Sequence, residues 1–255
     1  MTNLLWGVYP YVVFTLFFTV PIIRMVFRPY TITTRASGLF GRRLQGYAMH
    51  LFHWGIFLVL LGHIAGFVGG ALNFDFWVET VFYWSALIGG LMTLAGSVIA
   101  LARRIFIPEV RAMSSQLDDY MVHVFLIAIL GIALYQVIFQ EIFGITYSAA
   151  PWFASIWAFS PEPELMEGAS LLSQIHVFLA LTLFAYFPFT KLAHFWTLPV
   201  NYLVRPYQIM RTNHNHSRKR WEFALRSDKS YLTYLASVIL VGVVALSSFI
   251  VFGQG

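Results

Sequence analysis

Residues 49–70 read MHLFHWGIFLVLLGHIAGFVGG, with no acidic or basic side chain. About 20 apolar residues are enough to cross a bilayer as an α-helix, so this stretch predicts a transmembrane helix. It also contains two imidazole rings, His53 and His63, at depths where water is absent and polar groups need partners inside the protein. Imidazole is a good ligand for iron. The stretch therefore indicates a membrane protein whose function involves these rings.

Composition supports the same class of protein. Of 255 residues, 59% are hydrophobic and 11% are charged, which is too little charge to cover the surface of a soluble domain of this size. There is no cysteine, which excludes disulfides, thiolate-ligated iron–sulfur clusters and thioether-linked haem in this chain. Any haem must therefore be held by histidine or methionine.

The hydropathy pattern predicts an all-α integral membrane helical bundle with six transmembrane helices. We expect the amino-terminal segment to be the first of them and not a removable signal, because it has no basic n-region. The expected spans are residues 4–27, 46–68, 80–102, 119–140, 171–197 and 231–253.

The basic residues predict the orientation of these helices. All sixteen Lys and Arg side chains lie in or beside the first, third and fifth connections, whereas the second and fourth carry acidic ones. Because Lys and Arg stay on the cytoplasmic side, both termini should face outward. The net charge of +5 is then a topology signal, and no nucleic-acid partner is needed to explain it.

Two connections are longer than turns. Residues 141–170, on the outer side, mix aromatic, acidic and proline residues, which is typical of an interfacial segment at headgroup depth. Residues 199–230, on the inner side, are rich in Arg, Lys and His. They are either a docking surface for a soluble subunit or an anchor on anionic lipid.

Two further histidines match the first two in depth. His53 and His63 are ten residues apart, or about 15 Å along a helix, and His176 and His194 are eighteen apart, or about 27 Å. Their helices run in opposite directions, so His63 should face His176 on the outer side and His53 should face His194 on the inner side. Eighteen residues make five turns, which puts both later histidines on one helix face. A bend at Pro188 would reconcile the two gaps.

Several alternatives accompany this interpretation. The four rings could instead be hydrogen-bonded between helices without a metal. His50 lies one turn before His53 and could replace it. His123 follows two aspartates, Asp118 and Asp119, that resemble helix-start residues, while His214 and His216 fit a solvated loop. Glycines at four positions form one stripe that would either let a flat porphyrin approach or pack two helices together; they are Gly55, Gly62, Gly66 and Gly69.

Three motifs carry a family resemblance. LFHWGIFLVLLGH at 51–63, RRIFIPEVRA at 103–112 and HVFLALTLFAYFPFTKLAHFWTLPVNYLVRPYQ at 176–208 resemble the gamma subunit of respiratory nitrate reductases, a di-haem cytochrome b. The resemblance runs from about residue 4 to 212. It implies two b haems and a place in the inner membrane of the cell. We therefore expect a di-haem membrane domain over residues 1–230 and an additional carboxy-terminal helix over 231–255.

The resemblance implies specific roles. His53 and His194 would bind the haem iron nearer the cytoplasm, and His63 and His176 the iron of the outer haem. Such subunits oxidise membrane quinol near the outer haem and pass electrons to an iron–sulfur subunit. That subunit supplies a catalytic subunit containing the molybdenum cofactor, so this chain would reduce no substrate itself.

Two features depart from the family pattern. The family has a lysine at the outer start of its third helix, near the bound quinol, whereas this sequence has Thr80 beside Glu79. The candidate quinol-contacting residues are therefore Glu79, Thr80 and Gly62. Glu79 could accept the quinol proton, or it could be an ordinary exposed acidic residue. The other departure is the sixth helix, since the usual form has five.

These departures leave two other functions open. The chain could have the same electron-carrying role in a related complex, such as a nitrite-oxidising complex, another molybdoenzyme or a sulfur-cycle complex. Alternatively, it could be a haem-free transporter or membrane anchor, in which the histidines relay protons or only pack.

Overall fold

The computed structural model describes residues 2–28, 32, 41–72, 74, 76–143 and 149–197. The predicted sixth helix at 231–253 and the inner segment at 199–230 lie outside the described residues, as do His214 and His216. Those interpretations therefore stay predictions.

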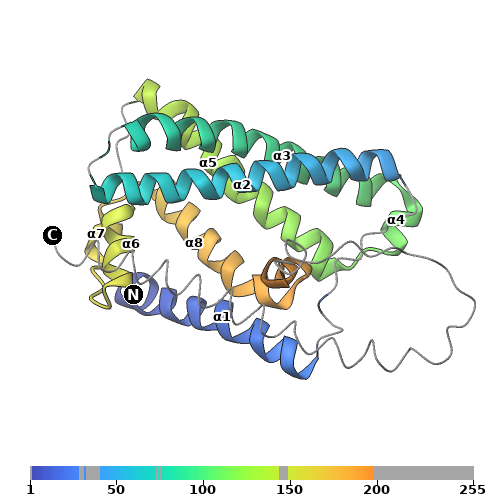
Figure 1. Ribbon diagram of the computed structural model, residues 1–255, viewed down its shortest axis with the longest axis horizontal. Coiled ribbons are helices and arrows are strands. Elements are labelled where there is room, and N and C mark those ends of the chain that lie inside the picture. The colour runs from blue at the N-terminus through green and yellow to red at the C-terminus, as the bar shows by residue number, and fades with distance from the viewer. Residues whose placement is uncertain are drawn as a thin grey trace, which may run out of the picture.

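The described chain is all-helical, as its hydropathy predicts. Five helical stretches are long and apolar enough to cross a membrane, and they match the first five predicted spans: Asn3–Phe27, Arg43–Gly69, Glu79–Phe106, Gln116–Phe139 and Leu171–Phe189. Figure 1 shows them side by side, joined by shorter elements. In chain order the elements are η1 (Asn3–Val8), α1 (Tyr9–Phe27), α2 (Arg42–Leu72), η3 (Phe76–Phe82), α3 (Tyr83–Phe106), α4 (Pro108–Ala112), η4 (Gln116–Met121), α5 (Val122–Phe143), α6 (Ala150–Trp157), α7 (Glu164–Glu167), α8 (Leu171–Tyr186), η5 (Phe187–Phe189) and η6 (Lys191–Thr197).

The helices form two groups joined by α5. The most extensive contact is between α2 and α3, and α3 also packs on α5. On the other side, α1 packs on α8, and α8 contacts α5. Within the described residues α2 and α8 have little direct backbone contact, and Figure 1 shows them in separate layers. The two helices that contribute His63 and His176 are therefore held apart by their neighbours.

Glycines explain the close packing of α2 on α3. A Cβ atom added at Gly55 would lie 2.5 Å from the backbone nitrogen of Thr93, and one added at Gly96 would lie 2.6 Å from that of Phe52. At Gly62 an added Cβ atom would meet the side chain of Ser85. Without side chains at these positions the two backbones can touch, as is common in membrane helices. Gly55 and Gly62 therefore lie against α3, which favours the helix-packing alternative for these two glycines.

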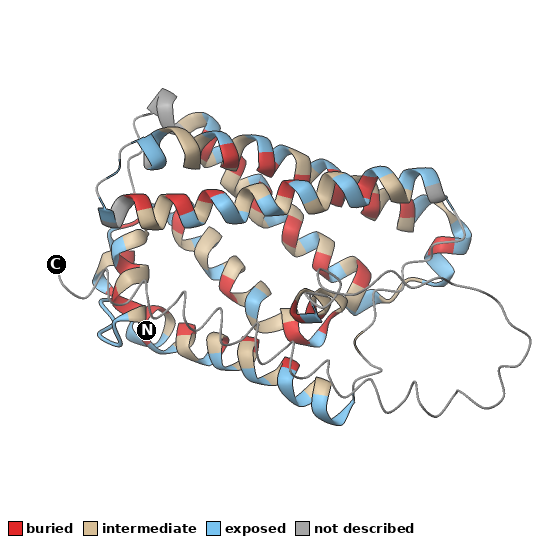
Figure 2. Ribbon diagram, in the orientation of Figure 1, coloured by how far each residue is buried: buried red, intermediate tan, exposed pale blue. Residues whose placement is uncertain are grey.

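Burial follows the pattern of a helix bundle in lipid. Figure 2 shows buried residues along the lines where helices meet, with exposed residues on the outer faces. The exposed residues include many large apolar side chains, among them Val12, Phe57, Leu91 and Val124. Hydrocarbon is a suitable solvent for such side chains, so the exposure agrees with the predicted membrane class.

The outer connection folds back onto the bundle. Trp152, in α6, is buried against Trp6, and its indole Nε1 donates a hydrogen bond to the Trp6 carbonyl at 3.0 Å. Ile156 and Met166 join the same cluster. The sequence predicts an interfacial segment here, whereas the structure makes its aromatic half part of the protein core, because α1 offers an apolar surface that covers it.

The fifth predicted span is interrupted. The sequence predicts one helix over residues 171–197, but α8 ends at Tyr186, and a short 3-10 turn, an extended residue at Thr190 and the 3-10 segment η6 follow. The continuous five-turn helix is therefore wrong, whereas the bend at Pro188 is confirmed. Proline has no N–H to donate and its ring clashes with the preceding turn, which explains why the helix ends there. Figure 1 shows η6 turned out of the line of α8.

Candidate functional site

The first two candidate ligands lie in one uninterrupted helix. In α2 the Nδ1 atoms of His53 and His63 are each 2.8 Å from the carbonyl oxygen four residues earlier, of Met49 and Val59. An Nδ1–H that donates to a carbonyl fixes the ring and leaves Nε2 as the free nitrogen, which is the usual arrangement in metal-binding histidines. Both rings are therefore oriented by the helix that contains them.

The inner pair is formed by His53 and His194, as the depth argument predicts. Their ring centroids are 6.3 Å apart and their planes are inclined by 60°. His194 Nδ1 is 2.6 Å from the carbonyl oxygen of Lys191, so its Nε2 is also left free. His50, the alternative inner ligand, is exposed, and the ring contact of His194 is with His53.

The helix is interrupted between α8 and η6, and polar groups at this break have hydrogen-bond partners. Thr190 is buried, and its hydroxyl accepts the Leu192 N–H at 3.1 Å and donates to the Phe187 carbonyl at 2.9 Å. The guanidinium of Arg24, in α1, donates to the Pro188 carbonyl. Backbone groups freed inside a membrane need such partners. The break is therefore a supported feature of the fold.

The outer pair combines α2 with α8. His63 lies in α2 and His176 in α8, and their pairing stays a prediction from their matching depths. The His176 Nδ1 lies 3.3 Å from the carbonyl oxygen of Ile129 in α5. This partner is on another helix, so α5 orients His176 although it contributes no candidate ligand. Sequence reasoning missed this contact because a backbone carbonyl has no signature in the sequence.

Aromatic side chains surround the outer pair. The Phe82 ring, at the end of η3, meets the His63 ring at 5.8 Å with an interplanar angle of 89°. Phe67, one turn after His63, stacks on Phe153 of α6 at 4.6 Å and 17°. Phe153 belongs to the outer connection, so this connection contacts the surroundings of His63 through the stacked rings of Phe67 and Phe153. Such packing excludes water from the site.

The arrangement fits a metal held between two rings. Two imidazoles that held one metal ion between them, with metal–nitrogen bonds of about 2 Å and ring centres roughly 1 Å beyond, would have centroids about 6 Å apart. The His53–His194 separation of 6.3 Å agrees with that distance. Within the described ranges no three His, Asp or Glu side chains gather as ligands for a metal ion. His53 and His194 could therefore hold a metal group that brings its remaining ligands with it.

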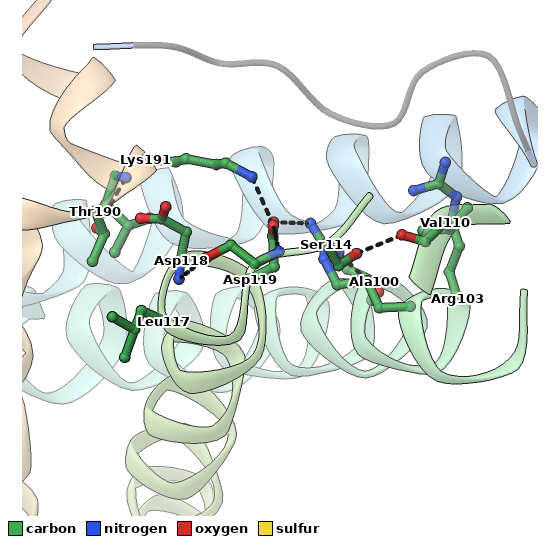
Figure 3. Close-up of polar contacts among 12 residues, drawn as sticks. Ala100, Arg103, Val110, Ser114, Leu117, Asp118, Asp119, Thr190 and Lys191 are labelled. Atoms are coloured by element: carbon green, nitrogen blue, oxygen red, sulfur yellow. Dashed lines mark hydrogen bonds and ion pairs between the residues drawn. The ribbon is translucent and has the colours of Figure 1, made fainter. Parts of the chain in front are cut away.

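An ion-pair cluster that sequence reasoning missed lies beside the inner pair. The Asp119 carboxylate, with a side chain 7% exposed, accepts from Arg104 Nη2 at 2.9 Å and from Lys191 Nζ at 2.6 Å. It also accepts the Ser115 N–H at 3.0 Å. Figure 3 shows Lys191 reaching across to Asp119. The sequence predicts Asp119 at a helix start, which is correct, but its partners are 15 and 72 residues away.

The remaining candidates lie at the ends of the bundle. Glu79 is exposed and Thr80 half-buried, both in η3 and a few residues before Phe82, which contacts His63. At the inner end, His123 is half-buried in the first turn of α5, and its Nδ1 has no hydrogen-bond partner among the described residues. The structure gives His123 no ring contact with the inner pair.

Comparison with known proteins identifies a family for this chain. Residues 2–213 match the family model described as nitrate reductase gamma subunit. The nitrate reductase gamma chain of Bacillus subtilis is 30% identical over 217 residues, covering 82% of this chain and 97% of that protein. The respiratory nitrate reductase 1 gamma chain of Escherichia coli is 28% identical, with 82% and 96% covered.

A longer relative also matches. The nitrate reductase-like protein NarX of Mycobacterium tuberculosis is 34% identical over 225 residues, which cover 83% of this chain but only 34% of that protein. The family match extends over all the described helices, including the four paired histidines. The chain therefore belongs to the nitrate reductase gamma subunit family.

Proposed function

We propose that this chain is the di-haem cytochrome b subunit of a quinol-oxidising respiratory complex of the nitrate reductase type. His53 and His194 would hold the inner haem iron, and His63 and His176 the outer one. The observation that supports this most directly is the 6.3 Å separation of the His53 and His194 rings. Bound haem would supply one-electron carriers at two depths of the membrane.

The protein's own part is to hold and orient the rings. The Nδ1 atoms of all four histidines lie near backbone carbonyl oxygens, so their Nε2 atoms can face a common ligand. His53 and His63 lie in α2, whereas His176 lies in α8 and His194 in η6, so each proposed pair joins two different elements. Apolar helices around them exclude water, which favours electron transfer over side reactions.

The quinol site would lie on the outer side, next to His63. Gly62 precedes that ring, and Phe82 of η3 packs against it. Glu79 is exposed three residues before Phe82, with Thr80 beside it. Glu79 would take a proton from a quinol hydroxyl at the membrane surface and release it outward. Thr80, with a hydroxyl, can hydrogen-bond the headgroup where the family has lysine.

The partners follow from the family and from the charge pattern. Electrons would leave the inner side for an iron–sulfur subunit and then a catalytic subunit carrying the molybdenum cofactor. Arg103, Arg104 and Arg111 lie together at the end of α3 and in α4, which agrees with a cytoplasmic face there. The chain would thus lie in the inner membrane with both termini outward, in contact with lipid and quinone.

Spectroscopy of the purified complex tests the proposal. Haem extraction should give two b haems per chain, and reduced-minus-oxidised spectra should resolve them. His53→Ala should remove one haem signal and His63→Ala the other, with chain abundance as the control. A preparation without haem would contradict the proposal and favour a transporter or anchor. Loss of the same signal in both variants would contradict the pairing.

A related complex is the second candidate. The nitrate reductase-like protein of Mycobacterium tuberculosis is 34% identical, whereas the Bacillus subtilis gamma chain is 30% identical. The same electron path could therefore serve a nitrite-oxidising complex, another molybdoenzyme or a sulfur-cycle complex. Mass spectrometry of the subunits that copurify with the chain decides between them, followed by assays with nitrate and nitrite.

A further inference from the structure

The two histidines of the inner pair are held in different ways. His53 lies in the middle of α2, a helix of 31 residues whose backbone hydrogen bonds fix its position. His194 lies in η6, a 3-10 segment of seven residues that follows an extended residue. Short 3-10 segments have poor hydrogen-bond geometry and little stability of their own. The position of His194 therefore depends on what holds η6 from outside.

Two sets of contacts hold η6. On one side Trp196 is buried and packs on Phe17 of α1, with ring centroids 4.9 Å apart. On the other side Lys191, its first residue, reaches Asp119 at 2.6 Å. Asp119 is in turn bonded to Arg104 of α3 and to the Ser115 backbone. The ion pair thus connects η6 to η4, which contains Asp119, and through Asp119 to Arg104 of α3.

Lys191 also contacts His194 directly. Its carbonyl oxygen is 2.6 Å from His194 Nδ1, so the Lys191 backbone sets the rotation of that ring. The same residue therefore binds Asp119 through its side chain and His194 through its main chain. Moving Lys191 would turn or shift the imidazole. In Figure 3 the Lys191 side chain extends over the first turn of η4 toward Asp119.

We propose that the Asp119–Lys191 ion pair is a positioning device for His194, which fixes the angle of its ring relative to His53. Asp119 and Lys191 are positioning residues, since neither contacts the His53 ring. The pair is largely shielded from water, where an ion pair with additional hydrogen bonds can fix geometry. This inference rests on the proposed function, because it takes His194 as a haem ligand.

The test uses the intact complex in membranes and the low-spin electron paramagnetic resonance signals of the two haems. The position of such a signal depends on the angle between the two imidazole planes. Lys191→Met removes the ion pair between Lys191 and Asp119 and leaves the buried Asp119–Arg104 pair in place. We expect the inner haem signal to shift or to convert partly to high-spin, while the outer signal stays unchanged. Asp119→Asn should move the same signal.

Two further variants separate positioning from other effects. Lys191→Arg keeps a cation that can reach Asp119 and should retain the wild-type inner signal. Asp118→Asn removes a neighbouring carboxylate that has no ion pair among the described residues, so it changes the charge without releasing η6. It should leave both signals unchanged. The outer signal reports whether each variant is folded.

The outcomes are distinct. A wild-type inner signal in Lys191→Met would overturn the positioning role while leaving the haem proposal intact, because aromatic packing of Trp196 would then be sufficient. Equal shifts in Asp118→Asn and Asp119→Asn would also overturn it, since charge alone would explain them. A wild-type complex without haem would overturn both the inference and the proposed function.

Discussion

The inner pair takes His194 from a seven-residue 3-10 segment, whereas the outer pair takes His176 from the second turn of an α-helix. Each pair is completed by a histidine of α2. At the inner end the surroundings are charged and hydrogen-bonded, with Arg24, Asp119 and Lys191 holding the broken chain. At the outer end they are mainly aromatic.

This difference shows that histidine rings of the same kind can be held in position either by polar contacts or by aromatic packing. A regular helix holds its side chains through backbone hydrogen bonds, so His176 needs only one contact from α5. An interrupted helix loses those bonds and needs side chains to replace them. We therefore expect polar substitutions to affect the inner pair and aromatic substitutions to affect the outer pair.

The largest effect should come from a change that both pairs share. In Gly55→Leu the new side chain would meet backbone atoms of α3, which cannot move aside, so destabilisation of more than about 3 kcal/mol is expected. Both haem signals and the amount of chain in the membrane should fall together. Gly131→Leu is the control, because its Cβ would meet nothing within 4 Å. Loss of only one signal in Gly55→Leu would contradict a shared scaffold.

A smaller and selective effect is expected at the inner end. Arg24→Met leaves the Pro188 carbonyl without its donor, which should destabilise the break by about 1–3 kcal/mol. Haem release on heating in detergent should then begin at the inner site at a lower temperature. Arg43→Met, at an exposed position, provides the matched control. Equal loss at both sites would argue against a local role for Arg24.

The outer counterpart is Phe153→Ala. Removing the ring that stacks on Phe67 should weaken the packing of the outer connection on α2 by roughly 1–2 kcal/mol and admit water near His63. The midpoint potential of the outer haem should change, and that of the inner haem should not. Phe106→Ala, at a side chain 78% exposed, is the control. A changed midpoint potential at the inner haem alone would contradict the placement of Phe153 near the outer haem.

The smallest effect is expected from Gln136→Leu. Its amide donates to the Ser173 hydroxyl at 2.7 Å and joins α5 to the outer start of α8. Such interhelical hydrogen bonds contribute about 0.6 kcal/mol on average. The outer haem should dissociate slightly earlier on heating, and Gln116→Leu, at an exposed position, should have no effect. A large loss would indicate that His176 depends on this link more than on Ile129.

Sequence reasoning was most accurate where the signal is local. The first four spans, the start of the fifth, the pairing of His53 with His194 and the bend at Pro188 follow from hydropathy, helix rise and the missing proline N–H, and the structure agrees with each. It was wrong about the unbroken helix over 171–197, because apolar composition alone does not distinguish a helix from a helix followed by a 3-10 segment. The role of the glycines was left open, since a stripe does not say which neighbour it meets.

The sequence by itself determined that this is a helical membrane protein and which rings lie at matching depths, because the membrane requires apolar length and hydrogen-bonded backbone within each segment. Only the tertiary structure decided that Gly55 meets α3, that Ile129 orients His176 and that Asp119 joins Lys191 to Arg104. Those contacts connect residues far apart in the chain. They depend on how the helices pack, which no local pattern specifies.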